Sequence, residues 1–359
     1  MIEHTNSFEP PGSHPPRRPH NPALAVALRH AHRVELPCSN ADKQSRRRPL
    51  TGGAIITHAA PEQVTQTAVE LFGDAGATWA KNLPMLVMEC ERRWGIRVGR
   101  PLPNLSYNYV ASATGAGGAA AILKLGYPGP GFEHEAEALR VFDGRAAAQL
   151  LELDLDAGAM LIERVVPGRP LGTVQDEEEA MAAAASVMRR VWRPVPAPHS
   201  FPTVAEWAEG FERLHAQFDG GAGPMPVALV ERAEAAFADL IASQRDPVLL
   251  HGDLHHGNIL SSTRDAWLAI DPKGLVGERE YEVGALLRNP DSLLRSPSAG
   301  RILERRIARL SDELTLDRER VRNWAAAQAV LAAYWGWEDH GQIWQDALEY
   351  AELLWKIRA

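Results

Sequence analysis

The sequence predicts an α+β protein with two lobes, a small sheet-rich N-terminal lobe and a larger helical C-terminal lobe. Short apolar runs bounded by Gly and Pro turns, typical of strands, fill roughly 96–168. After residue 176, apolar residues spaced by three and four positions dominate, which is typical of helices. A sheet-rich segment followed by a helical one implies two packed units with a cleft between them.

Length and composition fit a soluble globular protein that is large enough for two cores. The chain has 359 residues, of which 45% are hydrophobic and 23% charged. Its net charge of −8 argues against a nucleic-acid-binding protein and suits a polar or cationic small substrate. No apolar run approaches the roughly 18 residues of a membrane span. Cys38 and Cys90 lie in unlike contexts and imply no disulfide framework, so we expect a cytoplasmic protein.

Residues 1–53 are rich in Pro, Arg, His and Ser and show no sustained hydrophobic period, so we expect a disordered basic extension. Its eight basic and four acidic residues give it a charge of +4, which leaves −12 on the remainder. The extension is interpreted either as a basic nucleic-acid-binding arm or, more simply, as a dispensable tail or an upstream extension of the reading frame. We expect the N-terminal lobe over 54–168 and the C-terminal lobe over 169–359.

The spacing of apolar residues and the turn residues between them place the elements of the N-terminal lobe. In order, we expect two helices that end at Gly73 and Gly95, a hairpin over 107–125, a helix over 131–142, and strands over 148–153 and 159–166. In the C-terminal lobe we expect helices over 176–191, 204–218, 227–241, 281–288, 301–310, 317–335 and 342–356.

Lys124 lies inside the apolar strand Ala121–Leu125, and a lysine is seldom buried without a partner. In phosphoryl-transfer enzymes a strand lysine contacts the α- and β-phosphates and pairs with a glutamate from the next helix. The helix over 131–142 offers glutamates for this pairing. The alternative is an edge lysine whose ammonium group reaches solvent. The motif over His251–Leu260, described next, favours a buried Lys124 that pairs with a glutamate.

His251–Leu260 joins two apolar runs, and we expect a hairpin that carries a phosphoryl-transfer site. Asp253 and Asn258 match the kinase pattern H-R-D-x-x-x-x-N, in which the aspartate takes the proton of the acceptor hydroxyl and the asparagine holds Mg²⁺. Asp271 ends the next predicted strand, Ala266–Ile270, and supplies a further hard oxygen ligand. The first residue of the pattern, a histidine, is expected to hydrogen-bond the loop backbone.

Two features of this region have competing interpretations. Three histidines around Asp253 suggest a metal hydrolase, but the order H-x-D-x-H-H differs from the H-x-H-x-D-H of binuclear zinc sites, which makes this the weaker alternative. Lys273 either offsets phosphate charge or is a solvated turn residue, and the sequence does not separate the two.

The stretches His251–Leu260, Ile270–Glu278 and Tyr281–Pro290 resemble the aminoglycoside phosphotransferase superfamily, and within it the streptomycin kinase and hydroxyurea phosphotransferase group. The resemblance is dense over roughly forty residues and looser from about Leu71 to the C-terminus. It implies a bilobal protein-kinase-like fold, ATP and Mg²⁺ as cofactors, and transfer of the γ-phosphoryl group to a hydroxyl of a small-molecule acceptor. An aminoglycoside such as streptomycin and a role in antibiotic inactivation are implied with it.

Carried over to this chain, the resemblance makes Asp253 the catalytic aspartate and Asn258 and Asp271 the metal ligands. It makes Lys124 the lysine that contacts the nucleotide. Glu135 is expected to pair with this lysine because the first glutamate of the group's Glu-Ala-x-Ala-Leu-Arg pattern falls there, and Glu137 is the alternative.

The resemblance also assigns peptide groups between Ile162 and Val165, including those of Glu163 and Val165, to the hinge that meets adenine. One segment departs from the family. Where members usually carry a glycine pair over the phosphates, this chain has Pro101–Tyr107, whose backbone cannot approach phosphate as freely. We expect Asn104 and Ser106 to replace lost amide contacts and ATP binding to be weakened.

Two other functions remain as alternatives. One is a metabolic kinase of the same fold that acts on a sugar or another hydroxylated metabolite. The other is a catalytically weak kinase-like binding module, suggested by the glycine-poor loop and the basic extension. The sequence does not predict the oligomeric state.

Overall fold

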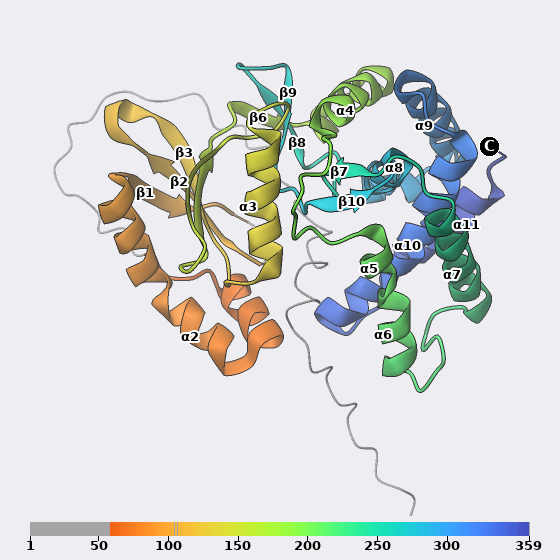
Figure 1. The fold of residues 1–359 in the computed structure, drawn as a ribbon, viewed down its shortest axis with the longest axis horizontal. Coiled ribbons are helices and arrows are strands. Elements are labelled where there is room, and N and C mark those ends of the chain that lie inside the picture. Colours follow the sequence, from red (N-terminus) through yellow and green to blue (C-terminus); the bar gives the residue numbers. More distant parts are fainter. Residues whose placement is uncertain (1–57, 104, 106, 359) are drawn as a thin grey trace, which may run out of the picture.

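A computed structural model describes residues 58–103, 105 and 107–358 of the chain (Figure 1). The predicted disordered extension over 1–53 lies outside the described residues, as do Asn104 and Ser106. We call α2 to β5 the N-lobe and the chain from β6 onward the C-lobe. The N-lobe carries the larger sheet and the C-lobe most of the helices, in the order that the sequence predicts.

The N-lobe is a five-stranded antiparallel sheet with a helix on each face. Its elements are α2 (Glu62–Trp94), β1 (Arg97–Pro101), β2 (Tyr109–Thr114), β3 (Ala120–Leu125), α3 (Pro130–Phe142), β4 (Leu150–Asp154) and β5 (Ala159–Glu163), with the strands in the order β1-β2-β3-β5-β4. The two helices predicted before the sheet form α2, whose backbone leaves helical geometry at Gly73 (φ 59°, ψ −136°), where the first of them is predicted to end.

Alternation along the strands decides which helix each side chain meets, because successive residues of a strand point to opposite faces. Ala159 and Leu161 of β5 pack in the cluster that includes α2, whereas Met160 packs with Phe132, Ala136 and Leu139 of α3. Lys124 pairs with Met160 across β3 and β5, so it lies on the face that α3 covers. A lysine in this register is directed at a helix instead of solvent.

The C-lobe packs its helices around α10. They are α4 (Glu177–Val191), α5 (Val204–Ala208), α6 (Gly210–Gln217), α7 (Val227–Ala242), α8 (Arg279–Leu287), α9 (Ala299–Leu314), α10 (Arg318–His340) and α11 (Gln345–Lys356). Helix α10 is buried along most of its length and contacts α6, α7, α8, α9 and α11. Its small and apolar residues occur on every face, which is typical of a central helix.

Two small sheets carry the loops that matter for function. They are formed by β6 (Pro167–Pro170), β8 (Ile259–Ser262) and β9 (Trp267–Ala269), and by β7 (Val248–Leu250) and β10 (Leu275–Gly277). The predicted hairpin is confirmed only for β8 and β9, because β7 pairs with β10 instead. The predicted lobe boundary at residue 168 falls inside β6, which pairs with β8, and the boundary stays a prediction.

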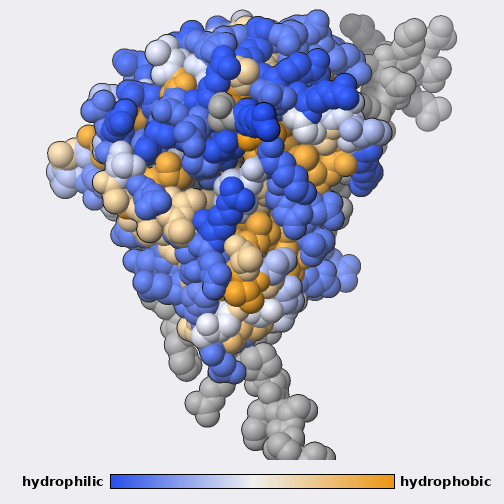
Figure 2. Space-filling model, turned by 90° about the vertical axis from the view of Figure 1, so that its right-hand side faces the viewer, coloured by the Kyte–Doolittle hydropathy of each residue, from blue (hydrophilic) through white to orange (hydrophobic). Residues whose placement is uncertain are grey.

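Seen from the right-hand side of Figure 1, the surface is largely hydrophilic, with hydrophobic residues confined to smaller areas (Figure 2). The C-lobe helices therefore turn their apolar faces inward. Within the described part of the chain, every helix is too short or too polar to cross a lipid bilayer.

Candidate active site

The loop that contains Asp253 directly follows the buried strand β7. The pairing of β7 with β10 fixes the position at which this loop begins. Gly252 follows in a left-handed conformation (φ 86°), and a Cβ atom there would lie 3.2 Å from the Cβ atoms of Lys273 and Leu275. Both the backbone angle and the close approach favour glycine. The loop therefore turns sharply against the segment that follows Asp271.

His251 has the structural role that the sequence predicts. Its Nε2 lies 2.8 Å from the carbonyl oxygen of Ile270, and its Nδ1 lies 3.2 Å from the peptide nitrogen of Asp253. Burial lowers the pKa of His251 to about 3, so the ring is neutral. Nδ1 then accepts from Asp253 and Nε2–H donates to Ile270. One ring thus joins the loop to the end of β9.

Asp253 is a buried carboxylate that is only 3% exposed. Among the described residues, its Oδ2 has no hydrogen-bond partner, and His255 Nε2 lies 3.9 Å from that atom. Burial raises the pKa of Asp253 to about 7, and the positive charges of Lys273 and Arg288 oppose this rise. An unpaired carboxylate oxygen at such a pKa can accept a proton from a hydroxyl group placed beside it.

Asn258 and Asp271 lie at the same end of the β8–β9 hairpin, because the peptide nitrogen of Ile270 donates to the carbonyl oxygen of Asn258 (2.9 Å). The side-chain nitrogen of Asn258 donates to the carbonyl of Asp253 (3.0 Å), which leaves its side-chain oxygen for a ligand. An amide oxygen and a carboxylate are hard donors, and Mg²⁺ commonly takes one or two such groups, with water and phosphate oxygens as its other ligands. The donor set fits Mg²⁺.

Lys124 of β3 connects the two lobes, because its side chain pairs with the Asp271 carboxylate of the C-lobe. Its Nζ atom lies 2.6 and 2.7 Å from the two carboxylate oxygens of Glu135 on α3, and it also contacts the Asp271 carboxylate. Burial lowers the pKa of Lys124, but the charges of Asp271 and Glu135 outweigh burial and raise the pKa above its ordinary value. The structure therefore places Glu135, and not Glu137, beside this lysine; Glu137 pairs with Arg140 on the helix surface.

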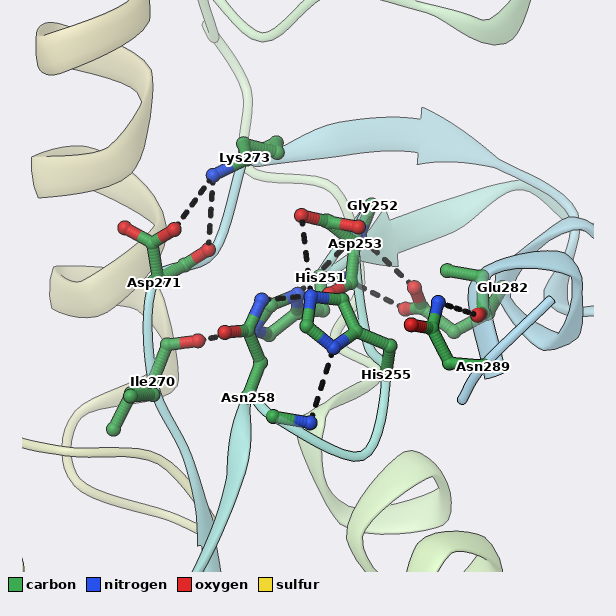
Figure 3. Close-up of polar contacts among 12 residues, drawn as sticks. His251, Gly252, Asp253, His255, Asn258, Ile270, Asp271, Lys273, Glu282 and Asn289 are labelled. Atoms are coloured by element: carbon green, nitrogen blue, oxygen red, sulfur yellow. Dashed lines mark hydrogen bonds and ion pairs between the residues drawn. The ribbon is translucent and has the colours of Figure 1, made fainter. Parts of the chain in front are cut away.

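Lys273 completes a row of alternating charges. Its Nζ atom lies 2.8 Å from Oδ2 of Asp271, and the two side chains face each other in Figure 3. Lys273 is only 8% exposed, so the solvated-turn interpretation of this residue is wrong. Asp271 itself adopts φ 60°, a conformation that is uncommon for residues other than glycine. Glu135, Lys124, Asp271 and Lys273 thus form one network, in which Asp271 is half-buried and the other three are buried.

The predicted hinge residues lie where the chain passes from β5 to β6. The peptide nitrogen of Glu163 donates to the carbonyl of Gln149 (2.8 Å), so this N–H group is already used within the protein. The Glu163 carboxylate pairs with Arg264 of the β8–β9 turn (2.8 Å). Val165 is buried against Ala148 and Leu268. Their contact with adenine stays a prediction.

Glu282 is a residue that positions the loop. From α8 its two carboxylate oxygens accept hydrogen bonds from the peptide nitrogens of His251 (2.7 Å) and Gly252 (2.9 Å), as Figure 3 shows. Burial raises the pKa of Glu282 to about 7, although these two N–H groups oppose the rise. The glutamates at 278, 280 and 282 were the only signal in the sequence.

Arg288, at the C-terminal end of α8, was not predicted to be a site residue. It is 2% exposed, its guanidinium donates to the side chain of Gln328 on α10 (2.5 Å), and its charge acts on Asp253 and His255.

Among the described residues, no group of three or more His, Cys, Asp or Glu side chains is placed to hold a metal ion. The metal-hydrolase alternative thus gains no support from these residues.

Comparisons with known proteins agree with this geometry. Residues 100–341 match the family described as aminoglycoside/hydroxyurea antibiotic resistance kinase. The chain is 31% identical to streptomycin 6-kinase of Streptomyces griseus over 281 residues, which cover 78% of this chain and 91% of that protein. It is 35% identical to hydroxyurea phosphotransferase of Kitasatospora aureofaciens over 293 residues, which cover 80% and 82% of the two chains.

Among solved structures, the choline kinase LicA of Streptococcus pneumoniae is similar to this chain, with a TM-score of 0.53 and 14% sequence identity. The similarity covers 76% of this chain and 98% of that one. At this identity the likeness concerns the fold alone. It confirms the predicted bilobal protein-kinase-like fold.

Proposed function

The chain belongs to the family of aminoglycoside and hydroxyurea antibiotic resistance kinases, and on that premise we propose that it transfers the γ-phosphoryl group of ATP to a hydroxyl of an aminoglycoside such as streptomycin. It is a phosphotransferase with an alcohol group as acceptor. The observation that carries the proposal is the buried carboxylate of Asp253, whose Oδ2 has no hydrogen-bond partner among the described residues, on a loop beside Asp271.

Asp253 orients the acceptor hydroxyl and receives its proton. A bond forms between the acceptor oxygen and the γ-phosphorus while the bond from that phosphorus to the β–γ bridging oxygen breaks, and ADP leaves. Because the transition state of this transfer is loose, the protein mainly positions the reactants and neutralises charge. His251, Glu282 and Gly252 hold the loop that does the positioning.

The nucleotide half of the site uses the N-lobe. Lys124, held by Glu135, binds the α- and β-phosphates, while the carbonyl of Glu163 and the peptide group of Val165 meet adenine. Asn258 and Asp271 hold Mg²⁺, which neutralises charge on the phosphates when it is bound. The row of alternating charges from Glu135 to Lys273 supports these assignments, because it joins the strand that carries the lysine to the end of the catalytic hairpin.

A phosphate-transfer screen tests the proposal. The full chain is incubated with ATP and Mg²⁺ and with streptomycin, a second aminoglycoside, hydroxyurea or glucose, and product is detected as a mass increase of one phosphoryl group. We expect an aminoglycoside to be modified and a sensitive host that carries the gene to tolerate streptomycin. Modification of glucose alone would make the chain a metabolic kinase, and no product with any acceptor would favour a binding module; either result contradicts the proposal.

Replacing Lys273 with methionine is expected to lower kcat by about 10²-fold with a smaller change in the KM for ATP. An ammonium group in a water-poor site stabilises the charge that develops during transfer, and removal of such a donor costs 10²–10³-fold in comparable sites. Steady-state kinetics with the acceptor found in the screen measure the effect. Lys81→Met is the matched control, because Lys81 is an exposed residue of α2. Wild-type kcat in Lys273→Met would show that Lys273 has no part in the reaction.

Replacing Glu282 with glutamine is expected to lower kcat by about 10²-fold, the usual result of a displacement near 1 Å in the reacting groups. An amide has one oxygen acceptor, so its NH₂ group would face one of the two peptide N–H groups that the carboxylate now accepts. Glu280→Gln on the same helix start is the control, since Glu280 touches Asp317 and not the loop. Equal turnover in both variants would remove the positioning role.

A further inference from the structure

A pocket of about 570 Å³ opens where the ends of α3 and α4 meet the β8–β9 turn, and its lining is dominated by arginine. The guanidinium groups come from Arg145, Arg189, Arg190, Arg193 and Arg264. Helix α4 and strand β9 are neighbours in Figure 1. We propose that this pocket, called here the arginine pocket, binds a small anion with two or more negative charges, of the phosphate or pyrophosphate type.

The arginine pocket carries more positive charge than the neighbouring carboxylates neutralise. Asp143 also lines it, Arg190 pairs with Asp265, and Arg264 pairs with Glu163. Three carboxylates against five guanidinium groups leave an excess of two positive charges. The chain as a whole carries a net charge of −8, so this concentration is not part of a generally basic surface.

Three of the five arginines have evident structural partners. Besides the ion pairs of Arg190 and Arg264, Arg189 donates to the carbonyl of Glu313 (2.6 Å). Arg189 and Arg190 also lie in the last turn of α4, where cations complement the helix dipole. These contacts within the protein account for three of the arginines, and no ligand is needed to explain their presence.

Arg145 and Arg193 have no such explanation. In the part of the chain that the structure describes, neither is paired with a carboxylate. Arg193 is half-buried, its Nε atom is buried without a hydrogen-bond partner, and its Nη1 contacts only the carbonyl of the preceding Trp192 (3.1 Å). Burial and the nearby charges of Arg145 and Arg190 lower the pKa of Arg193. Partial burial of an unpaired guanidinium is costly, and an anion between these side chains would offset that cost.

The arginine pocket is distinct from the site around Asp253. None of the residues predicted to bind the nucleotide, the metal ion or the acceptor lines it. Residues of the arginine pocket nevertheless contact the segments that carry the catalytic loop and the predicted hinge. Arg193 pairs with Leu249 of β7, two residues before His251, and Arg264 holds Glu163 at the end of β5. A polyvalent anion is the fitting ligand, because guanidinium forks bind phosphate oxygens through paired hydrogen bonds.

Calorimetric titration of the full chain with pyrophosphate, in metal-free buffer of constant ionic strength, tests the proposal. Arg145→Gln removes an exposed side chain and is expected to weaken binding about tenfold, the effect of losing about 1.4 kcal/mol. The variant with both Arg145→Gln and Arg193→Gln is expected to lose measurable binding. Arg301→Gln, an exposed arginine of α9, is the matched control and should bind as the wild type does.

Equal affinity in the wild type and Arg145→Gln would overturn the proposal. Loss of binding in Lys124→Met with retention in the double variant would place pyrophosphate in the nucleotide site and overturn it too. If the double variant fails to fold, Arg145→Glu decides, since charge reversal at an exposed position must still abolish binding. A single-stranded RNA is titrated in parallel. RNA binding that depends on Arg145, without pyrophosphate binding, would mean a nucleic-acid surface and contradict the proposed small-anion pocket.

Discussion

Replacing Asp253 with asparagine is expected to remove nearly all phosphoryl transfer while the protein stays folded. The amide has the same shape as the carboxylate but cannot receive the proton of the acceptor hydroxyl, and loss of a general base lowers turnover by about 10²–10⁴-fold. The measurement is single-turnover transfer of the γ-phosphoryl group to the acceptor identified by the screen. Wild-type turnover in Asp253→Asn would refute the assignment of Asp253.

The same variant is expected to be more stable than the wild type in the metal-free protein above pH 7. Burial raises the folded-state pKa of Asp253 to about 7, so the ionised side chain destabilises the folded state. This penalty is absent below the ordinary carboxyl pKa near 4, grows as pH rises from there towards 7, and is constant above the folded-state pKa. We expect the difference in unfolding free energy to be about 1–4 kcal/mol at pH 8 and to vanish near pH 4. Denaturant unfolding at both pH values measures it, and a less stable variant at pH 8 would contradict it.

Replacing Asp271 with asparagine is expected to lower transfer by about 10³-fold and to raise the Mg²⁺ concentration that half-saturates the enzyme. The amide weakens metal binding, and Lys124 and Lys273 lose the charge that now lies between them. Asparagine tolerates the left-handed backbone at this position (φ 60°), so strain does not obscure the result. Asp271→Ala is expected to lose transfer as well, with added backbone strain of about 1–3 kcal/mol.

Asp246→Asn is the matched control for Asp271→Asn. Asp246 also has a positive φ angle (41°), but it is exposed and lies on the turn before β7. Its replacement should leave the Mg²⁺ titration of activity unchanged. An unchanged Mg²⁺ titration and full turnover in Asp271→Asn would show that this carboxylate is not a metal ligand.

Local patterns predicted the parts of the fold that depend on neighbouring residues. Apolar spacing predicted the helices, and Gly73 was predicted to interrupt the first of them because it can adopt backbone angles that other residues avoid. A lysine within an apolar strand pointed to a buried partner. The pairing of β7 was missed, because its partner β10 lies about 25 residues away along the chain and strand pairing leaves little local signal.

The identity of the charged partners required the folded chain. Glu135 and Glu137 are equivalent by composition, and only the register of α3 on the sheet turns Glu135 toward Lys124. The burial of Lys273 likewise depends on how the segment after β9 packs against Gly252. The arginine pocket gathers residues from the segment after α3, from the end of α4 and from the β8–β9 turn, and no single stretch of sequence contains enough of them to reveal it.

The sequence by itself determined the chemistry of the protein, because the spacing of Asp253, Asn258 and Asp271 is a local property of one hairpin and the loop that precedes it. The tertiary structure decided how that loop is held and which cations face it. Glu282 reaches the loop from α8, and Lys124 reaches Asp271 from the other lobe. Such contacts join residues distant in sequence, and their geometry follows from the packing of whole helices and sheets, which residue spacing along the chain does not record.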